Sequence, residues 1–133
     1  LAYAEKGKGA FLNNKPINVS GYTALNQAAL SLGNIASLAA SPQWANLGQI
    51  ITQVQRIRGY GDFLHYHLLA SGKIDAIIES DVNILDIAAL SVIVREAGGI
   101  FTDLSGGALN LETKTVLAAA SAEIHADLLA RLN

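Results

Sequence analysis

The chain has 133 residues, of which 51% are hydrophobic and 15% are charged, and this composition excludes an intrinsically disordered protein. The formal net charge of −2 is too close to zero to favour nucleic acid or an anionic membrane surface as a partner. No apolar stretch reaches the roughly 18–20 residues that span a bilayer. The chain has no cysteine, which excludes disulfides and thiolate metal sites and fits a cytoplasmic location.

The first part of the chain is punctuated by turn-forming residues, namely Gly7, Gly9 and the pair Asn13-Asn14. Because glycine and asparagine mark tight turns, they predict a hairpin of short extended segments. A run of small and apolar residues further on predicts a buried strand. The predicted strands of this part cover residues 1–5, 10–12, 16–20 and 28–32.

Helices and strands alternate over the rest of the chain. Ser41 before Pro42 predicts a capped helix start, because serine accepts bonds from free N–H groups and proline fits the first helical position. Asp62 predicts the cap of a second helix, and Ser121 predicts the cap of the last one. The predicted helices cover residues 42–55, 63–70, 84–97 and the segment after Ser121, and the predicted strands cover residues 74–78, 100–103 and 116–120.

This order of elements predicts an α/β fold class, with α+β character at the N-terminal hairpin. In α/β sheets, functional groups gather where strands end and helices begin. Two such junctions carry polar residues, at residues 58–62 and 79–86. Functional groups are therefore expected at these two junctions.

Asp86 opens an otherwise apolar helix, and this pattern has two interpretations. A carboxylate in the first turn complements the helix dipole. It can also ligate Mg²⁺, which prefers carboxylate oxygens and keeps waters and substrate phosphate in its shell. Together with Glu79 and Asp81, Asp86 forms either a solvated loop or a negative pocket for a metal ion or for a cationic or hydroxyl-rich substrate. Spacing alone does not decide between them.

Arg58 begins a second polar cluster that ends at Asp62. The planar guanidinium of Arg58 can bind a phosphate or a carboxylate. The alternative is a surface Arg–Asp pair of little energetic value, and spacing alone favours this alternative.

The three histidines are predicted to be structural or to lie on the surface. His65 and His67 are two residues apart, so on a helix they point in different directions and do not make a metal-binding pair. His125 falls in the last predicted helix. The chain has no His-Glu-x-x-His, no Gly-x-Ser-x-Gly and no phosphate-binding P-loop.

Three stretches, in the right order, resemble the inositol-monophosphatase superfamily. Residues 86–99, DIAALSVIVREAGG, are similar to the family's second signature, W-D-x-A-A-x-x-x-x-x-x-E-A-G-G. Residues 4–13, AEKGKGAFLN, resemble the family's A-x-x-G-x-G-A-F-x-N hairpin. Residues 58–63, RGYGDF, look like the form found in histidinol-phosphatases. The resemblance covers nearly the whole chain.

The resemblance implies the C-terminal half of a layered αβαβα sandwich and a Mg²⁺-dependent phosphomonoesterase, in which bound Mg²⁺ activates water for in-line attack. By motif match Asp86 is a metal ligand, Arg58 and Glu79 contact the substrate, and Asp62 helps to organise the pocket. The complete protein is expected to be a homodimer that hydrolyses histidinol phosphate to histidinol and phosphate. An inositol or sugar phosphate remains an alternative substrate, and a non-catalytic truncated or degenerate homologue an alternative class.

Two departures from the family pattern bear on these expectations. Leu85 stands where the second signature has tryptophan, which is expected to change packing beside Asp86 rather than ligation. The first signature, D-P-[IL]-D-G-[TS], and an upstream glutamate are absent, and both supply further metal ligands in the family. The chain also has no methionine and begins at Leu1, which suggests part of a longer protein.

These departures predict how the chain is divided. Residues 1–40 are expected to be the strand-rich end of an N-terminal α+β part, and residues 41–133 the C-terminal α/β part, with the upstream metal-binding half absent. The chain alone is predicted neither to bind Mg²⁺ tightly nor to hydrolyse phosphate esters, and it holds no residue assigned as catalytic.

Overall fold

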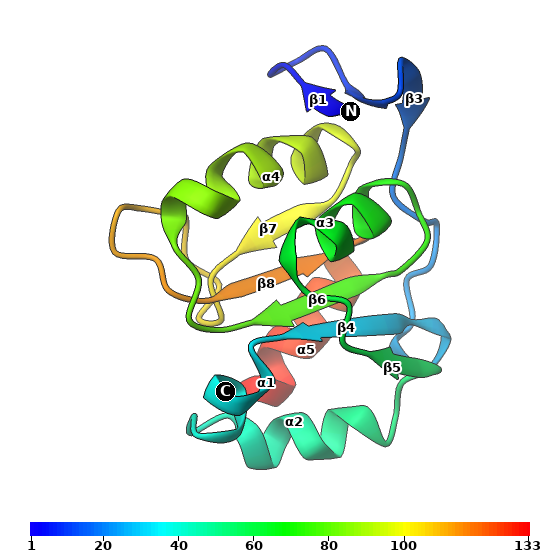
Figure 1. The fold of residues 1–133 in the computed structure, drawn as a ribbon. Helices are drawn as coiled ribbons and strands as arrows, with labels where there is room; N and C mark the ends of the chain where they lie inside the picture. Colours follow the sequence, from blue (N-terminus) through cyan, green and yellow to red (C-terminus); the bar gives the residue numbers. More distant parts are fainter.

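The structure, a computed structural model, describes all of residues 1–133 and consists of two β-sheets with helices between and beside them (Figure 1). In chain order the elements are β1 (Ala2–Ala4), β2 (Ala10–Leu12), β3 (Lys15–Ile17), a 3₁₀ turn η1 (Leu25–Gln27), β4 (Ala29–Gly33), α1 (Ile35–Ala39), α2 (Trp44–Ile51), β5 (Arg56–Arg58), α3 (Asp62–Ala70), β6 (Ala76–Glu79), α4 (Ile84–Glu96), β7 (Ile100–Thr102), β8 (Val116–Ala119) and α5 (Ala122–Leu132).

Strands β1, β2 and β3 form an antiparallel three-stranded sheet. Its turns use residues with positive φ: Gly9 (83°) precedes β2, and Asn13 (50°) and Asn14 (65°) connect β2 to β3. Glycine has no Cβ to clash in this region, and asparagine enters it more readily than most residues. The predicted hairpin is confirmed, with a third strand shorter than expected.

The second sheet has five strands in the order β5-β4-β6-β8-β7. Strands β4, β5 and β6 run parallel, and β8 is antiparallel to both of its neighbours. Both β6 and β8 are buried along their whole length, which is why they are continuous apolar runs rather than alternating ones. The mixed sheet with its helices confirms the predicted α/β class.

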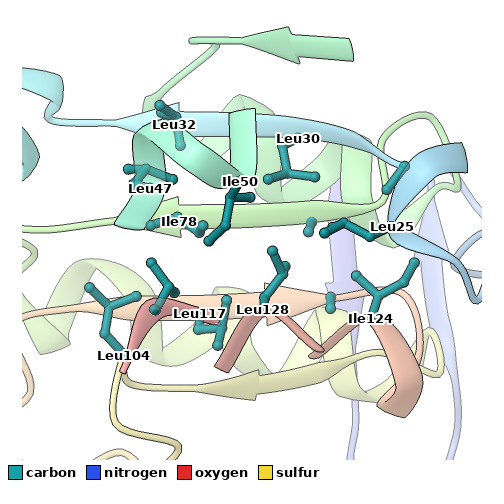
Figure 2. Packing of buried hydrophobic residues seen from close by; sticks show 14 of the residues in the cluster. Leu25, Leu30, Leu32, Leu47, Ile50, Ile78, Leu104, Leu117, Ile124 and Leu128 are labelled. Carbon is teal, nitrogen blue, oxygen red and sulfur yellow. The ribbon is translucent and has the colours of Figure 1, made fainter. Parts of the chain in front are cut away.

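One face of this sheet packs against α1, α2 and α5. Alternate residues of β4, β6 and β8 point to this face, because successive side chains of a strand alternate between the two sides. They include Leu30 of β4, Ile78 of β6 and Leu117 of β8, which meet Ile50 of α2 and Leu128 of α5 in a single buried cluster. Figure 2 shows these side chains gathered between the strands and the two helices.

The other face packs against α3 and α4. Here Ile77 of β6 and Ala118 of β8 meet Tyr66 of α3 and Val94 of α4 in a second buried cluster. Ala10 of β2 belongs to the same cluster, so α4 is covered on its far side by the three-stranded sheet (Figure 1). The layers are therefore sheet, helix, sheet and helix. The division of the chain at residue 40 stays a prediction, and β4 joins residues before that point to the sheet formed by residues after it.

The helix predicted over residues 42–55 is wrong in its start and its cap. The helix α2 covers only Trp44–Ile51, and a short helix that the sequence did not predict, α1, precedes it. The hydroxyl of Ser41 donates to the carbonyl oxygen of Leu38 at the end of α1 (2.6 Å), and no side chain caps α2. The serine therefore serves the preceding helix rather than the following one.

The end of that predicted helix is also wrong, because β5 follows directly. After α2, the hydroxyl of Thr52 donates to the carbonyl oxygen of Gln49 (2.7 Å). Beyond it Arg56, Ile57 and Arg58 alternate in the period of a strand, with Ile57 packed on the core and both arginines exposed. A strand that pairs in parallel with β4 therefore occupies the place of the predicted last helical turn.

The other helix ends follow ordinary capping chemistry. Asn83 accepts from the backbone N–H of Leu85 (2.9 Å) at the start of α4, and Ser121 accepts from that of Ile124 (3.2 Å), as predicted. The predicted cap at Asp62 is wrong: Asp62 is the first residue of α3, and Gly61 precedes it with φ 68° and ψ −178°, a conformation open essentially to glycine alone. None of the helices combines the length and the apolar character that crossing a membrane requires.

The three-stranded sheet is fastened to the end of α4 by Glu96, whose Oε1 accepts from the backbone N–H of Gly9 (2.9 Å). Hydrogen bonds from the backbone of Gly7 and Gly9 lower the pKa of Glu96 below its ordinary value. A carboxylate whose pKa is lower in the folded protein than in the unfolded chain stabilises the fold. This contribution is fully present above the pKa of the unfolded chain, and it is lost as the pH falls through the pKa of the folded protein. We therefore expect the free energy of unfolding to fall less on acidification in Glu96→Gln than in the wild type.

Urea unfolding of the wild type and of Glu96→Gln, followed from neutral to acidic pH, measures this effect. The matched control is Glu112→Gln, at an exposed glutamate in the loop before β8. The difference in unfolding free energy between wild type and Glu96→Gln is expected to shrink as the pH falls. A difference that stays constant with pH would contradict the assignment to the Glu96 carboxylate.

Candidate functional site

The carboxyl ends of the three parallel strands lie at one edge of the five-stranded sheet. Strand β4 ends at Gly33, β5 at Arg58 and β6 at Glu79. The loops that leave these strands lead into α1, α3 and α4, so both polar junctions picked out in the sequence come to the same edge. This is the position where open α/β sheets bind ligands.

A cavity of about 500 Å³ opens at this edge. Four carboxylates line it: Asp62, Glu79, Asp81 and Asp86. Its apolar wall comes from α3, α4 and the loop before α4, and includes Phe63, Val82, Ile87 and Leu90. No lysine or arginine lines it, so the cavity is negatively charged and suits a cation.

Glu79 is the most enclosed of the four acids, with a side chain only 8% exposed. Its Oε1 accepts the phenolic hydrogen of Tyr66 and lies 3.2 Å from Nε2 of His65. Burial, the charge of Glu79 and this hydrogen bond together raise the pKa of Tyr66 well above its usual range, so the phenol stays a donor. The carboxylate of Glu79 is thus held by two side chains of α3.

The remaining acids are held less tightly. Asp62, Asp81 and Asp86 are exposed, and none of their carboxylates makes a side-chain hydrogen bond or ion pair within the chain. Asp86 lies in the first turn of α4, after the cap formed by Asn83. Their oxygens are free to meet a ligand. Leu85, which stands in place of the signature tryptophan, is 81% exposed and packs little against its neighbours.

The four predicted site residues do not all come together. Asp62, Glu79 and Asp86 share the cavity. Arg58 is exposed at the end of β5 and does not line it, and its Nη1 donates to the carbonyl oxygen of Ile57 (2.7 Å). The chain has no ion pair between Arg58 and Asp62, the alternative considered from the sequence. A contact between Arg58 and the substrate stays a prediction.

Oxygen ligands are what Mg²⁺ prefers, and the cavity offers carboxylates from Asp62, Asp81 and Asp86 without thiols. However, no group of three or more histidine, cysteine, aspartate or glutamate side chains lies close enough together to hold a metal ion. The donors present therefore fit part of a Mg²⁺ site, and the chain by itself does not complete one.

A second cavity, of about 490 Å³, includes Arg56, Lys73 and Asp75 in its lining. The carboxylate of Asp75 is already satisfied, because Oδ1 accepts from the hydroxyl of Ser20 and Oδ2 from the backbone N–H of Ala29 (2.8 Å). The acid of this cavity is structural, and the cavity at the carboxyl ends of the strands remains the better candidate.

All of residues 1–133 match the inositol monophosphatase family. The chain belongs to that family. It is 36% identical over 136 residues to a histidinol-phosphatase of Mycobacterium tuberculosis, across 98% of this chain and 52% of that protein. It is 34% identical to human inositol monophosphatase 2, across 93% of this chain and 45% of that protein. The family predicted from the three motifs is confirmed.

Solved structures match the fold of the chain. The extragenic suppressor protein suhB of Bartonella henselae superposes with a TM-score of 0.87 at 30% identity, across 98% of this chain and 50% of that one. An IMPase of Thermotoga maritima superposes with a TM-score of 0.84 at 30% identity, across 99% and 50%. The chain has the mixed α/β architecture of the C-terminal half of these structures and spans about half the length of the relatives it matches.

Sequence reasoning missed several residues that line or support this cavity. Tyr66 lines the cavity and His65 lies behind it, yet both sit in a helix where the pattern indicated only structure. Asn34 also lines the cavity, and its amide donates to the carbonyl oxygen of Ser80 (2.6 Å), which ties the loop after β4 to the loop after β6. A polar residue directly after a buried strand was the one available signal for Asn34.

Proposed function

We propose that the complete protein is a Mg²⁺-dependent phosphomonoesterase and that this chain supplies one wall of its active site. The supporting observation is the cavity at the carboxyl ends of the parallel strands, where Asp62, Glu79 and Asp86 arrive from separate elements and no basic residue neutralises them. Membership of the inositol monophosphatase family adds to this support.

In this proposal Asp86 holds Mg²⁺ through its exposed carboxylate, together with ligands from outside the chain. When bound, Mg²⁺ supplies positive charge that screens the phosphate and acidifies water. Glu79 binds a polar or cationic part of the substrate, and Asp62 helps to organise the cavity. Arg58 reaches the substrate from the rim, where its exposed guanidinium can bind an anionic oxygen.

The proposed substrate is histidinol phosphate, in a homodimeric protein. The stretch from Arg58 to Phe63, with its resemblance to histidinol-phosphatases, favours it, and so does a cavity lined by four acids, because histidinol phosphate carries an ammonium group. The second candidate is an inositol phosphate or another sugar phosphate. It is favoured by relatives named inositol monophosphatase that match at nearly the same identity.

The test is turnover of histidinol phosphate and inositol 1-phosphate, side by side, by the complete protein with Mg²⁺. We expect kcat/KM to favour histidinol phosphate by about 10- to 100-fold, the size of one hydrogen-bonded charge pair. A preference for inositol 1-phosphate would select the second candidate, and no Mg²⁺-dependent turnover of either compound would refute the proposal. The isolated 133-residue chain serves as the control, and it is expected to be inactive.

A further inference from the structure

A buried chain of hydrogen bonds runs behind the cavity and ends at Glu79. The backbone N–H of Tyr60 donates to Oγ of Ser31 (3.1 Å), and Oγ of Ser31 lies 3.0 Å from Nδ1 of His65. On its other side, Nε2 of His65 lies 3.2 Å from Oε1 of Glu79. The side chains of Ser31 and His65 are fully buried, so water does not replace these partners.

The partners of Ser31 indicate the tautomer of His65. Ser31 already accepts from Tyr60, so its own hydroxyl hydrogen needs an acceptor, and Nδ1 of His65 is the acceptor within reach. The ring hydrogen of His65 then sits on Nε2 and donates to Glu79. In this arrangement Nδ1 of His65 accepts from Ser31 and Nε2 donates to Glu79.

The second carboxylate oxygen of Glu79 is left open. Oε1 takes both hydrogen bonds, from Tyr66 and from His65, whereas Oε2 has no partner in the chain. No fully buried side-chain oxygen or nitrogen lacks a partner, so Oε2 is reached by solvent, and Glu79 lines the cavity. The absence of a side chain at Gly33 makes this possible, because a Cβ there would overlap Oε2 and lie 2.6 Å from Cδ.

The carboxylate of Glu79, held by two hydrogen bonds to Oε1, differs from the other three acids of the cavity. Asp62, Asp81 and Asp86 are exposed and make no side-chain hydrogen bond, whereas the Glu79 carboxylate is held by His65 and Tyr66. A carboxylate already held in one orientation loses little entropy when it binds a cation, which favours selective recognition.

We propose that Ser31, His65 and Tyr66 are positioning residues that hold Oε1 of Glu79 so that Oε2 binds the ammonium group of the phosphomonoester substrate. The inference rests on the proposed phosphatase function. It adds that Glu79 recognises the ammonium group of the substrate. The two hydrogen bonds to Oε1 do not touch the phosphate, so they govern discrimination between amino and non-amino phosphate esters rather than turnover itself.

The experiment compares, in the complete protein, histidinol phosphate with the same ester lacking its amino group. Tyr66→Phe removes only the phenolic hydroxyl, and His65→Asn removes the donor to Glu79. For each variant we expect the KM for histidinol phosphate to rise about tenfold, with the KM for the deaminated ester and both kcat values changed less than about twofold. His65→Gln, whose amide can reach the position of Nε2, is expected to restore most of the loss.

His67→Asn is the matched control, because His67 lies on the same helix, makes no side-chain hydrogen bond to Glu79 and does not line the cavity. Equal losses for both esters, or losses in kcat alone, would mean a structural role and would overturn the inference while the proposed function stands. Unchanged KM values would overturn it too. A wild type that hydrolyses neither ester would refute the proposed function, and the inference with it.

A second readout does not depend on activity. Nitrogen chemical shifts of His65 in the wild-type protein at neutral pH are expected to be those of the neutral tautomer with its hydrogen on Nε2. A doubly protonated ring, or a hydrogen on Nδ1 alone, would overturn the donor arrangement on which the inference depends.

Discussion

Replacing Asp86 with asparagine is expected to abolish most phosphatase activity of the complete protein. The substitution keeps the shape of the side chain but removes the negative charge that a Mg²⁺ ion requires. Loss of a residue that only supports a metal ligand typically costs about 10- to 100-fold in metal affinity or activity, so loss of a ligand should lower kcat/KM at least about 100-fold. Steady-state turnover of histidinol phosphate at saturating Mg²⁺ measures it.

The fold should survive this change. The carboxylate of Asp86 is exposed and makes no hydrogen bond or ion pair in the chain, so asparagine loses only its interaction with the start of α4, about 0.3–1 kcal/mol. Asp127→Asn is the control, because Asp127 lies on α5 and pairs with Arg131 at the surface. If Asp86→Asn keeps wild-type activity, Asp86 is only a helix-terminus acid.

Leu117→Ala is expected to be strongly destabilising. Leu117 is 0% exposed on β8, between β6 and β7, and belongs to the buried cluster that joins the sheet to α2 and α5 (Figure 2). Truncating such a side chain loses the transfer free energy of the removed atoms and leaves a cavity. Together these two effects lower the free energy of unfolding by about 2–5 kcal/mol. Against a total stability of about 5–15 kcal/mol, this is a large fraction.

Urea unfolding followed by circular dichroism measures the loss, and Leu111→Ala is its control. Leu111 is 82% exposed in the loop before β8, so truncating it should change the free energy of unfolding by less than about 0.5 kcal/mol. Equal effects of the two substitutions would mean that Leu117 does not lie in the packed core of the protein.

Much of the fold was readable from the sequence because its strands are bounded by unmistakable turns. Asn13 and Asn14 adopt positive φ where the pattern placed a turn, and the apolar run before Ser121 is β8. The cap at Ser121 was predictable because its hydroxyl has only one helix to serve. Ser41 lies between two helices, and no sequence pattern indicated that its hydroxyl would bond the earlier one.

Strand β5 was missed for a related reason. Three residues, Arg56 to Arg58, are too short to show a strand period clearly, and the apolar helical spacing that precedes them ran on to Val54. Pairing with β4, remote in sequence, decides the structure there. Local preference is a weak guide where tertiary pairing competes with it.

The candidate site was also only partly predictable from the sequence. The junctions that carry Asp62, Glu79 and Asp86 could be picked out in advance, because functional groups gather where strands end and helices begin. That the three residues line one cavity became clear only from the structure. The hydrogen-bond network behind Glu79 could not be predicted, because Ser31 faces His65 only once β4 and α3 are packed together. Arg58 lies at the end of β5 but does not line the cavity, and its Nη1 donates to the carbonyl oxygen of Ile57, a rotamer choice that sequence does not specify.

The central claim is that the Asp86 carboxylate is a metal ligand in the complete protein, and a crystal structure with bound Mn²⁺ tests it most directly. Mn²⁺ takes the same oxygen ligands as Mg²⁺ and can be located by its anomalous scattering. We predict an ion in the cavity with an Asp86 carboxylate oxygen at about 2.1 Å. An ion bound elsewhere, or in this cavity with Asp86 outside coordination distance, would contradict the account.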